Sequence, residues 1–371
     1  MQIGLSLCLG ANLRSGGASF SPASLFSDGD GALIQRSDDA YFTDQYATTQ
    51  AVDANTVGFA TDVSEGAGYA AGAWSGLGPE LSQDSWILSG SWSETLDSIV
   101  FDGPDRGYAY LSLSSISAQQ HYVVELDIIQ PSLGTSAYLG MSGVPAPHID
   151  VVFGAGASGP KRAIFLSGNA AEFLIRKIED GTMEVAKDAL VKHLPGRHLT
   201  QSTASYRPTL TATGLSFDGS DDRLTNLRPP TTSGTIAARF NGSTASRVIF
   251  GSQAASDGRC FLALDASGKI AAGIGAQGTS TIAGGADIRG AWHTAAVTWD
   301  GSTVTLYLDG VSVYSAAQSG AVNTTVAMML GALNANGTAA AFWAGTVSDA
   351  LVIDRVLTTD EITNLNTYWS A

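Results

Sequence analysis

The chain has little cysteine and little charge. Its two cysteines, Cys8 and Cys260, lie far apart among 371 residues, which excludes a small secreted scaffold held together by disulfides and predicts two free thiols. Charged residues make up only 14% of the sequence, below the roughly 25% of an average soluble protein. Nineteen Lys and Arg against 34 Asp and Glu give a net charge of −15, so nucleic acid and anionic membranes are poor partners.

Long apolar runs are also missing. The first thirteen residues, MQIGLSLCLGANL, are apolar, but no basic residue precedes them and the stretch is too short to span a bilayer. No other stretch approaches the ~18 apolar residues of a membrane span. We therefore expect no secretory signal and no membrane insertion, so that if the protein reaches the cell exterior it does so by a route other than general secretion.

What the sequence does contain is typical of turn-rich β structure. Alternating apolar and polar residues predict many short strands, most clearly over 121–130, and the turns Asp300-Gly301 and Asp309-Gly310 predict a three-strand meander over 292–314. Only residues 359–368 are helical in pattern, with Thr358 and Glu361 at the spacing of a capping box. The predicted fold class is all-β, with two antiparallel β-sandwich (jelly-roll) domains after an N-terminal anchoring segment.

Breaks in composition predict four segments. Residues 1–84 form an attachment or linker segment, residues 85–195 a β-sandwich, residues 196–208 a linker after the breaker Pro195-Gly196, and residues 209–371 a second sandwich. We expect residues 205–371 to fold on their own, because a sandwich of that length can bury its own core.

One pair of carboxylates raises the possibility of catalysis. Glu125 and Asp127 lie on one face of a predicted strand, as the paired carboxylates of some retaining glucanases do. The third position of that pattern is Gln130, which cannot donate a proton as a general acid. We therefore expect no enzyme, and interpret the two carboxylates as the polar face of a sandwich.

Two sets of polar residues are candidates for binding. Asp218, Asp221 and Asp222, joined by Asp349 from a late strand, offer hard oxygen ligands for calcium, the one cofactor that these residues suggest; the alternative is an Asp-rich turn. Polar residues expected in loops or at strand ends are candidates for glycan binding, although any soluble domain carries such residues: Arg247, Asp257, Arg259, Asn334 and Asn336. Tyr108 and Tyr110 share one face of a predicted strand, which is either a binding face or a plain half-covered sheet.

Three separated motifs carry a resemblance to a known family. The stretches LSFDGSDDRL (215–224), GAWHTAAVTWDGSTVTLYLDGVSVYS (290–315) and GTVSDALVIDRVLTTDEI (345–362) resemble the laminin-G-like, concanavalin A-like jelly-roll domain over about residues 205–371. The resemblance implies a sandwich of two antiparallel sheets that binds glycans or proteins, often with calcium, and usually without catalysis.

The upstream residues carry a second resemblance. FSPASLF (20–26), Ser37-Asp38-Asp39 with Phe42, and the hinge GRHLTQSTASYRPTL (196–210) are similar to modular structural proteins of tailed phages and phage-derived gene transfer particles. Such chains often have a Trp-Tyr-Asp-Pro run where this one has residues 33–36 as LIQR, which leaves the attachment partner open. The central domain looks like a carbohydrate-binding module.

This second resemblance implies a head spike or tail fibre of a virion. The protein would assemble in the host cytoplasm as a homo-oligomer and be exposed on the particle surface. It would attach to other capsid or tail proteins through Phe20, Leu25 and Phe26, and bind host-surface polysaccharide through the laminin-G-like domain. The alternatives are a bacterial surface adhesin and, third, a polysaccharide-cleaving enzyme.

Overall fold

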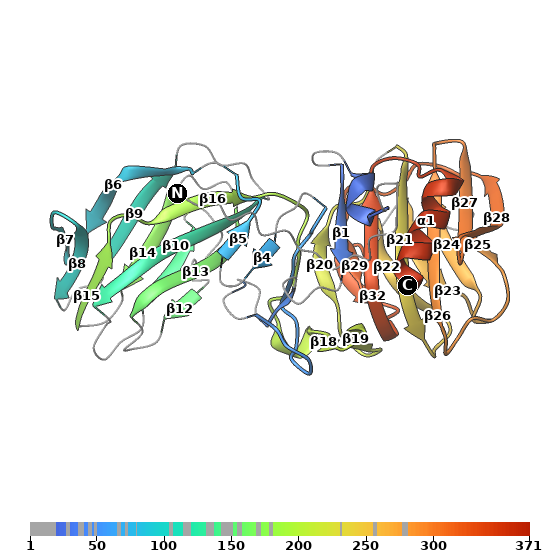
Figure 1. Ribbon diagram of the computed structural model, residues 1–371, viewed down its shortest axis with the longest axis horizontal. Coiled ribbons are helices and arrows are strands. Elements are labelled where there is room, and N and C mark those ends of the chain that lie inside the picture. The colour runs from blue at the N-terminus through green and yellow to red at the C-terminus, as the bar shows by residue number, and fades with distance from the viewer. Residues whose placement is uncertain are drawn as a thin grey trace, which may run out of the picture.

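The computed structural model describes most of the chain from Phe20 onward. The described residues are 20–26, 30–35, 41–43, 47, 50–64, 68–70, 73–78, 80–103, 107–113, 120–130, 137–141, 151–153, 158–167, 172–177, 181–230, 232–254, 258–276 and 281–371. They form two β-sandwiches that lie side by side along the long axis of the molecule (Figure 1). Within these ranges no helix has the length and apolar character that crossing a membrane requires.

The central sandwich has two antiparallel sheets. One runs β13-β10-β15-β8-β7 with β16 also paired to β10, and the other runs β12-β11-β14-β9-β6. Their strands are β6 (Ser82–Ser89), β7 (Trp92–Glu94), β8 (Ser98–Gly103), β9 (Gly107–Leu113), β10 (His121–Gln130), β11 (Ala137–Met141), β12 (Val151–Phe153), β13 (Gly159–Leu166), β14 (Glu172–Lys177), β15 (Gly181–Ala186) and β16 (Leu190–Leu194). Alternate residues fill the core between the sheets, among them the fully buried Phe101 and Phe173.

The C-terminal sandwich also has two sheets. The first runs β18-β19-β32-β21-β26-β27-β28, with β1 paired to β32, and the second runs β2-β3-β17-β20-β29-β22-β23-β24-β25 with β30 and β31 attached. The first contains β1 (Gly31–Gln35), β18 (Thr209–Thr211), β19 (Gly214–Asp218), β21 (Gly234–Gly242), β26 (Trp292–Trp299), β27 (Thr303–Leu308), β28 (Val311–Ala317) and β32 (Ala344–Ile353).

The second sheet completes this sandwich around Trp299, Trp343, Phe240 and Phe250, which are all buried. It contains β2 (Tyr41–Phe42), β3 (Phe59–Ala60), β17 (Leu199–Thr200), β20 (Leu224–Leu227), β22 (Arg247–Gln253), β23 (Arg259–Leu264), β24 (Ile270–Gly275), β25 (Thr281–Gly284), β29 (Met328–Leu330), β30 (Leu333–Ala335) and β31 (Thr338–Ala340). The other elements are η1 (Pro22–Leu25), η2 (Ala204–Tyr206), the hairpin of β4 (Gly68–Ala70) with β5 (Ala73–Ser75), and α1 (Thr359–Ser370).

The predicted fold class is confirmed. The chain is mostly β, with antiparallel sheets arranged as sandwiches, and the predicted meander is formed by β26, β27 and β28. At its second turn Asp309 and Gly310 have φ values of 50° and 80°, the backbone that the Asp-Gly pair predicts. The predicted helix is α1, and the capping box of Thr358 and Glu361 is present.

The N-terminal strands belong to the C-terminal sandwich. Strand β1 pairs with β32 from Gly31 opposite Ile353 to Gln35 opposite Asp349, and Figure 1 shows the two strands side by side. β2 pairs with β3, which continues through β17 into the second sheet. The central sandwich is therefore inserted between two parts of the C-terminal one, an arrangement that the four predicted segments do not include.

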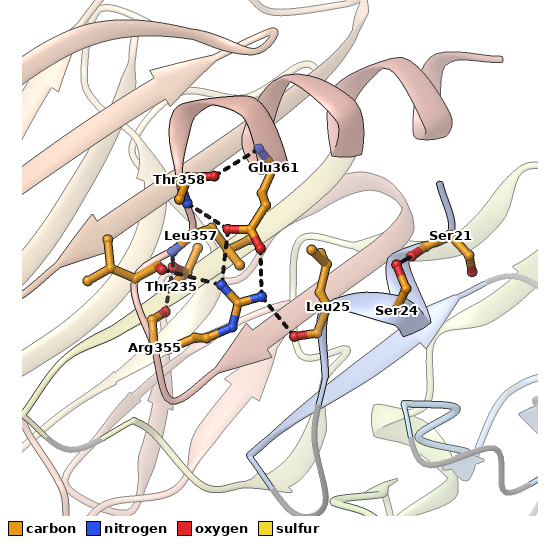
Figure 2. A network of polar contacts seen from close by, with 9 residues as sticks. Ser21, Ser24, Leu25, Thr235, Arg355, Leu357, Thr358 and Glu361 are labelled. Atoms are coloured by element: carbon orange, nitrogen blue, oxygen red, sulfur yellow. Dashed lines mark hydrogen bonds and ion pairs between the residues drawn. The ribbon is translucent and has the colours of Figure 1, made fainter. Parts of the chain in front are cut away.

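A polar network fastens η1 and α1 together (Figure 2). The Arg355 guanidinium donates to the Leu25 carbonyl at 2.9 Å and to both carboxylate oxygens of Glu361 at 2.8 and 3.0 Å. Glu361 also accepts the backbone N–H of Thr358 at 2.8 Å, and its pKa is lowered, first by the bond from Arg355. A single arginine therefore connects the N-terminal segment to the cap of the C-terminal helix.

Replacing Arg355 with Gln is expected to lower the free energy of unfolding by about 1 kcal/mol, since the charge-assisted bonds are lost at a partly exposed site. Limited proteolysis should cut residues 20–35 faster than in the wild type. Arg289→Gln is the matched control, because Arg289 pairs with the exposed Asp287 beside it at the surface; it should change neither measurement. Equal behaviour of the two variants would contradict the assigned role of Arg355.

Candidate functional site

An acidic loop lies at the end of β19. Asp218 is the last residue of that strand, Gly219 follows with φ of 82°, and Asp221 and Asp222 precede β20. One carboxylate oxygen from each of the three aspartates lies within 4.8 Å of the others. The structure thus brings together three of the four residues predicted to bind calcium.

Hydrogen bonds within the loop fix the carboxylates of Asp218 and Asp222. Oδ1 of Asp218 accepts the backbone N–H of Ser220 at 2.8 Å and of Asp221 at 3.3 Å, and Oδ2 of Asp222 accepts the N–H of Asp218 at 3.0 Å. Partial burial acts to raise the pKa of Asp218, but the backbone donors outweigh it and the pKa is lowered. Burial, followed by the neighbouring negative charges of Asp218 and Asp221, raises the pKa of Asp222 to about 6. The loop therefore holds negatively charged carboxylates close together, and their repulsion disfavours the ionised form of Asp222.

This donor set fits a hard cation in part. The second carboxylate oxygens of Asp218 and Asp222, with the carboxylate of Asp221, are of the oxygen type that calcium prefers. Calcium takes six to eight oxygen ligands, so water, backbone carbonyls or a ligand hydroxyl would have to supply the rest.

Asp349 does not join the acidic loop. Along β32, Asp218 lies opposite Ala344, whereas Asp349 lies five residues further, opposite Gln35 and Arg239. Burial raises the pKa of Asp349 to about 6, while the hydroxyl of Ser348, at 2.6 Å, and the charge of Arg239 act against that rise. The fourth predicted ligand is separated from the loop by about 16 Å of extended strand, at ~3.3 Å per residue.

A stacked arginine adjoins the acidic loop. The guanidinium carbon of Arg223 lies 4.0 Å from the ring centroid of Tyr206 and 6.0 Å from that of Phe342. Arg223 also donates to the carbonyl of Asp221 at 2.7 Å. The guanidinium of Arg223 and two aromatic rings therefore lie beside three carboxylates. Together these side chains provide hydrogen-bond donors, hydrogen-bond acceptors and apolar ring surface.

The residues predicted to bind glycan lie in two places. Arg259 donates to the side chains of Gln253, at 3.1 Å, and of Thr281, at 2.9 Å, while Asn336 donates its N–H to the Gln253 carbonyl at 2.8 Å. Asn334 is buried in the same turn. Its Oδ1 accepts the N–H of Gly337 and its Nδ2 donates to the carbonyl of Ala327, each at 2.7 Å. These three residues share one end of β22, and Asn334 has a structural role there.

Arg247 begins the other end of β22. The next residue, Val248, donates its N–H to the carbonyl of Ala341 at 2.9 Å. This bond brings Arg247 toward Phe342, the ring that lies beside Arg223. Asp257 lies outside the described residues. The predicted set is thus divided between the acidic-loop end of β22 and its far end.

The residues predicted to attach to a particle pack inside the chain. Leu25 is 6% exposed in a cluster with α1, and Phe20 and Phe26 pack against the same cluster; the ring centroids of Phe20 and Tyr368 are 6.2 Å apart. Attachment through these residues stays a prediction. Their described contacts are intramolecular.

The hinge residues that carry the phage resemblance also have structural contacts. Gln201 is buried and donates to the carbonyl of Arg223 at 3.1 Å. Arg207 donates to the carbonyls of Gln201 at 2.9 Å and Thr43 at 2.7 Å. These bonds fix the connector beside the acidic loop.

The glucanase-like carboxylates are surface residues of the central sandwich. Glu125 forms a cross-strand ion pair with Arg162, and Asp127 is exposed on the same strand; the side chain of Gln130 lies outside the described ones. Among the tryptophans, Trp299 and Trp343 are buried in the core, while Trp292 is partly exposed with the guanidinium carbon of Arg239 at 5.5 Å.

Sequence reasoning missed Tyr206, Arg223 and Phe342 as site residues. Arg223 directly follows the Asp pair in FDGSDDR, and this is the one local signal that was present. Tyr206 and Phe342 lie in a connector and in a late loop, so only the fold brings them to the arginine.

Comparison with known proteins supports the predicted jelly-roll fold of the C-terminal sandwich. Residues 218–363 match the family model described as the concanavalin A-like lectin/glucanases superfamily. The predicted resemblance of this region to laminin-G-like jelly rolls is thereby confirmed. No curated protein matches the chain.

Several solved structures are similar to parts of this chain. The CBM40 of the Ruminococcus gnavus IT-sialidase, bound to α2,3-sialyllactose, is 19% identical with a TM-score of 0.33, over 37% of this chain and 84% of that one. Domain 4 of AbnA, an arabinanase of Geobacillus stearothermophilus, in complex with arabinotriose, is 17% identical with a TM-score of 0.33, over 41% and 75%. Domains LG4-5 of the mouse laminin α1 chain are 14% identical with a TM-score of 0.32, over 69% and 89%.

Proposed function

We propose that the C-terminal sandwich binds a host cell-surface polysaccharide, and that the chain is a structural protein, a head spike or tail fibre, of a tailed-phage or gene transfer particle. The observation that carries the binding proposal is the meeting of three carboxylates with a ring-stacked arginine at one end of the sandwich. The region that matches the lectin superfamily model includes this acidic loop. The virion role is supported by the resemblance of the upstream motifs.

Each group has a definite part in the proposed binding. The carboxylates of Asp218, Asp221 and Asp222 accept hydrogen bonds from sugar hydroxyls, or hold a calcium ion that sugar hydroxyls complete. Arg223 keeps its guanidinium in place by stacking on Tyr206, so its remaining N–H groups are oriented donors. The ring of Phe342 offers the C–H face of a sugar an apolar surface.

The expected ligand is a neutral or mixed-charge glycan. A chain of net charge −15 repels strongly anionic polymers at low salt, unless calcium bridges the two. An open loop surface contacts few sugar units, so single-site affinity should be on the order of millimolar to tens of micromolar, and useful adhesion requires several copies. A homo-oligomer on a symmetric particle supplies those copies.

Binding of an oligomeric form of the full chain to a glycan array and to host cells tests the proposal. Asp221→Asn with Asp222→Asn should abolish binding, because both the acceptor charge and the cation ligands are lost. The control Asp287→Asn alters a carboxylate elsewhere on the same sandwich and should bind as the wild type does. Loss of binding in a chelator would assign calcium to the loop, whereas binding by the double variant would overturn the site.

The virion proposal is tested separately. The chain should be found by mass spectrometry in purified particles, and its gene should lie beside capsid or tail genes. Deleting residues 1–26 removes Phe20, Leu25 and Phe26 and should abolish incorporation into particles. Deleting residues 1–19 keeps these three residues and every contact that the structure describes, and should leave incorporation unchanged. Release of soluble sugar by the wild type would instead indicate an enzyme.

A further inference from the structure

The outer face of the central sandwich carries a pair of tyrosines. Strand β9 alternates buried residues with partly exposed ones, so Ala109, Leu111 and Leu113 enter the core while Tyr108 and Tyr110 lie on the outer side. The two rings are stacked, with centroids 5.8 Å apart and an interplanar angle of 22°. Large aromatic side chains in partial contact with solvent are common where proteins bind ligands.

Strand register arranges the neighbours of these tyrosines in rows. Tyr110 lies between Ile87 of β6, which is 52% exposed, and Leu174 of β14, which is buried, so Ile87 and Tyr110 supply the accessible apolar surface of this row. Tyr108 lies between Ser89 and Arg176 in the next row. The face therefore has an apolar row with a polar row beside it.

A third row of residues gives the two ends of this face opposite charges. This row contains Ser112 opposite Glu172, and it lies on the other side of Tyr110 from the row of Arg176. Arg176 and Glu172 thus lie at opposite ends of the tyrosine pair, about 13 Å apart along β14 at ~3.3 Å per residue. A bound molecule would meet a cation at one end and an anion at the other.

Arg176 has unused hydrogen-bonding capacity. Its guanidinium carbon lies 5.6 Å from the ring centroid of Tyr108, which restricts the side chain. Its buried Nε has no hydrogen-bond partner within the part of the chain that the structure describes. The terminal N–H groups of the same guanidinium can donate the two parallel bonds that a ligand carboxylate accepts.

The size and chemistry of the face favour a sugar over a protein partner. A stable protein interface buries ~800 Å² on each side with an apolar centre, whereas here a single apolar row is bounded by serine and charged residues. A pyranose has an apolar C–H face that can lie on aromatic rings, and a hydroxyl edge that needs both donors and acceptors. Burial, then the nearby Tyr108 and Glu172, raises the pKa of Tyr110, so its phenol remains a donor.

We propose that this face is a second binding site, separate from the acidic loop, and that it binds a saccharide bearing a carboxylate. The sugar ring lies on Tyr108 and Tyr110, its carboxylate accepts two hydrogen bonds from Arg176, and Glu172 fixes the direction of the chain by repelling the carboxylate from the other end. The acidic sugar would be one unit of the mixed-charge glycan expected above. The site does not depend on calcium or on the C-terminal sandwich.

Isothermal titration of the full-length protein with defined tetrasaccharides tests this site. The probes are tetrasaccharides of glucuronate, galacturonate and mannuronate, each compared with its carboxyl-reduced form. At least one acidic probe should bind at least tenfold more tightly than its reduced partner, because only the acidic form satisfies Arg176. Arg176→Gln should remove that preference, and Arg176→Lys should not restore it, since an ammonium cannot form the paired bonds.

Further variants separate ring stacking from charge and from folding. Tyr110→Ala should weaken binding of the acidic and the reduced forms alike, and Tyr314→Ala, at a tyrosine that is 44% exposed on the other sandwich, should change neither. Asp221→Asn with Asp222→Asn should leave this binding intact, which distinguishes failure here from failure of the acidic loop. Melting temperatures should match the wild type. No binding of any acidic probe, or an unchanged preference in Arg176→Gln, would overturn the proposal.

Discussion

Residues 205–371 expressed alone are expected not to fold cooperatively, although the sequence motifs of this region suggest an independent domain. The fragment lacks β1, β2, β3 and β17, which the structure places in the two sheets of the sandwich. Circular dichroism should show a broad thermal transition, and limited proteolysis should degrade the fragment rapidly. The structure thus changes the expectation drawn from sequence.

The size of this effect follows from β1. Ala32 and Ile34 point into the sandwich core, whereas Leu33 packs in the cluster under α1, so the strand is buried on both faces. Each fully buried Leu or Ile contributes about 1.5–3 kcal/mol, and Tyr41 and Phe59 are lost as well. The total is on the order of 10 kcal/mol, comparable to the whole net stability of a domain.

A linked chain provides the control. Residues 20–63 joined by a flexible linker to residues 196–371 restore the missing strands and omit the central sandwich. This linked chain should melt in one sharp transition. A sharp melt of residues 205–371 without the N-terminal strands would show that β1 is dispensable.

The sequence pattern correctly predicted those elements that are determined by residues close together in the sequence. The Asp-Gly turns, the capping box of α1 and the alternation of β9 and β10 depend on neighbours in sequence, and they are present. Strand β1 was not predicted because GALIQ is buried on both faces and therefore does not alternate. Its partner lies more than 300 residues away, and no local pattern specifies such a pairing.

The same limit applies to the site. FDGSDD identified the carboxylates because they are close in sequence, and the turn brings them together. The position of Asp349 depended on which end of β32 pairs with β19, and register places it at the other end. The stacking of Arg223 on Tyr206 joins a loop to a connector, and residue type alone carries no sign of that contact.

The contact between the two sandwiches contains buried histidines. Phe42 and Phe59 pack against Val123, Ile164 and Leu194 of the central sandwich. The ring of His198 stacks on Phe59 with centroids 5.4 Å apart, and lies 5.0 Å from the ring of His121. The connection between the sandwiches thus depends on two rings that are fully enclosed.

A buried carboxylate organises the same region. Asp62 accepts backbone N–H bonds from Leu33 and Arg197, at 2.8 and 2.7 Å, and donates its own N–H to Nδ1 of His198 at 2.9 Å. Arg197 in turn forms a two-bond ion pair with Asp354. Because Nδ1 of His198 accepts a bond, its neutral form is fixed with the proton on Nε2.

Burial keeps both histidines neutral. Burial lowers the pKa of His198 to about 4. Backbone hydrogen bonds to Leu194 and Pro195 partly oppose this lowering, and the charge of His193 contributes to it. Burial, followed by the charges of His198 and His193, lowers the pKa of His121 well below 6.5. Between pH 6.5 and about 4 the unfolded chain therefore binds a proton at His198 that the native chain does not, and the free energy of unfolding falls as pH falls.

Replacing His198 with Asn is expected to remove this acid sensitivity, since the amide oxygen can accept the Asp62 N–H but does not titrate. At pH 7.5 the variant should be less stable than the wild type, because its contact with Phe59 is lost. From pH 6.5 to about 4 the wild type should lose about 1.4 kcal/mol per pH unit relative to the variant, on the order of 3 kcal/mol in all.

Urea unfolding of both proteins at a series of pH values measures this difference. The comparison with the variant is essential because burial raises the pKa values of Asp62, Asp222 and Asp349. A carboxyl with a raised native pKa binds its proton more readily in the native chain, so it increases stability as pH falls and masks the histidines in the wild-type curve. These carboxyls are present in both proteins, and their effects cancel in the difference. Parallel stability curves between pH 6.5 and 4 would show that His198 is not held neutral at this contact.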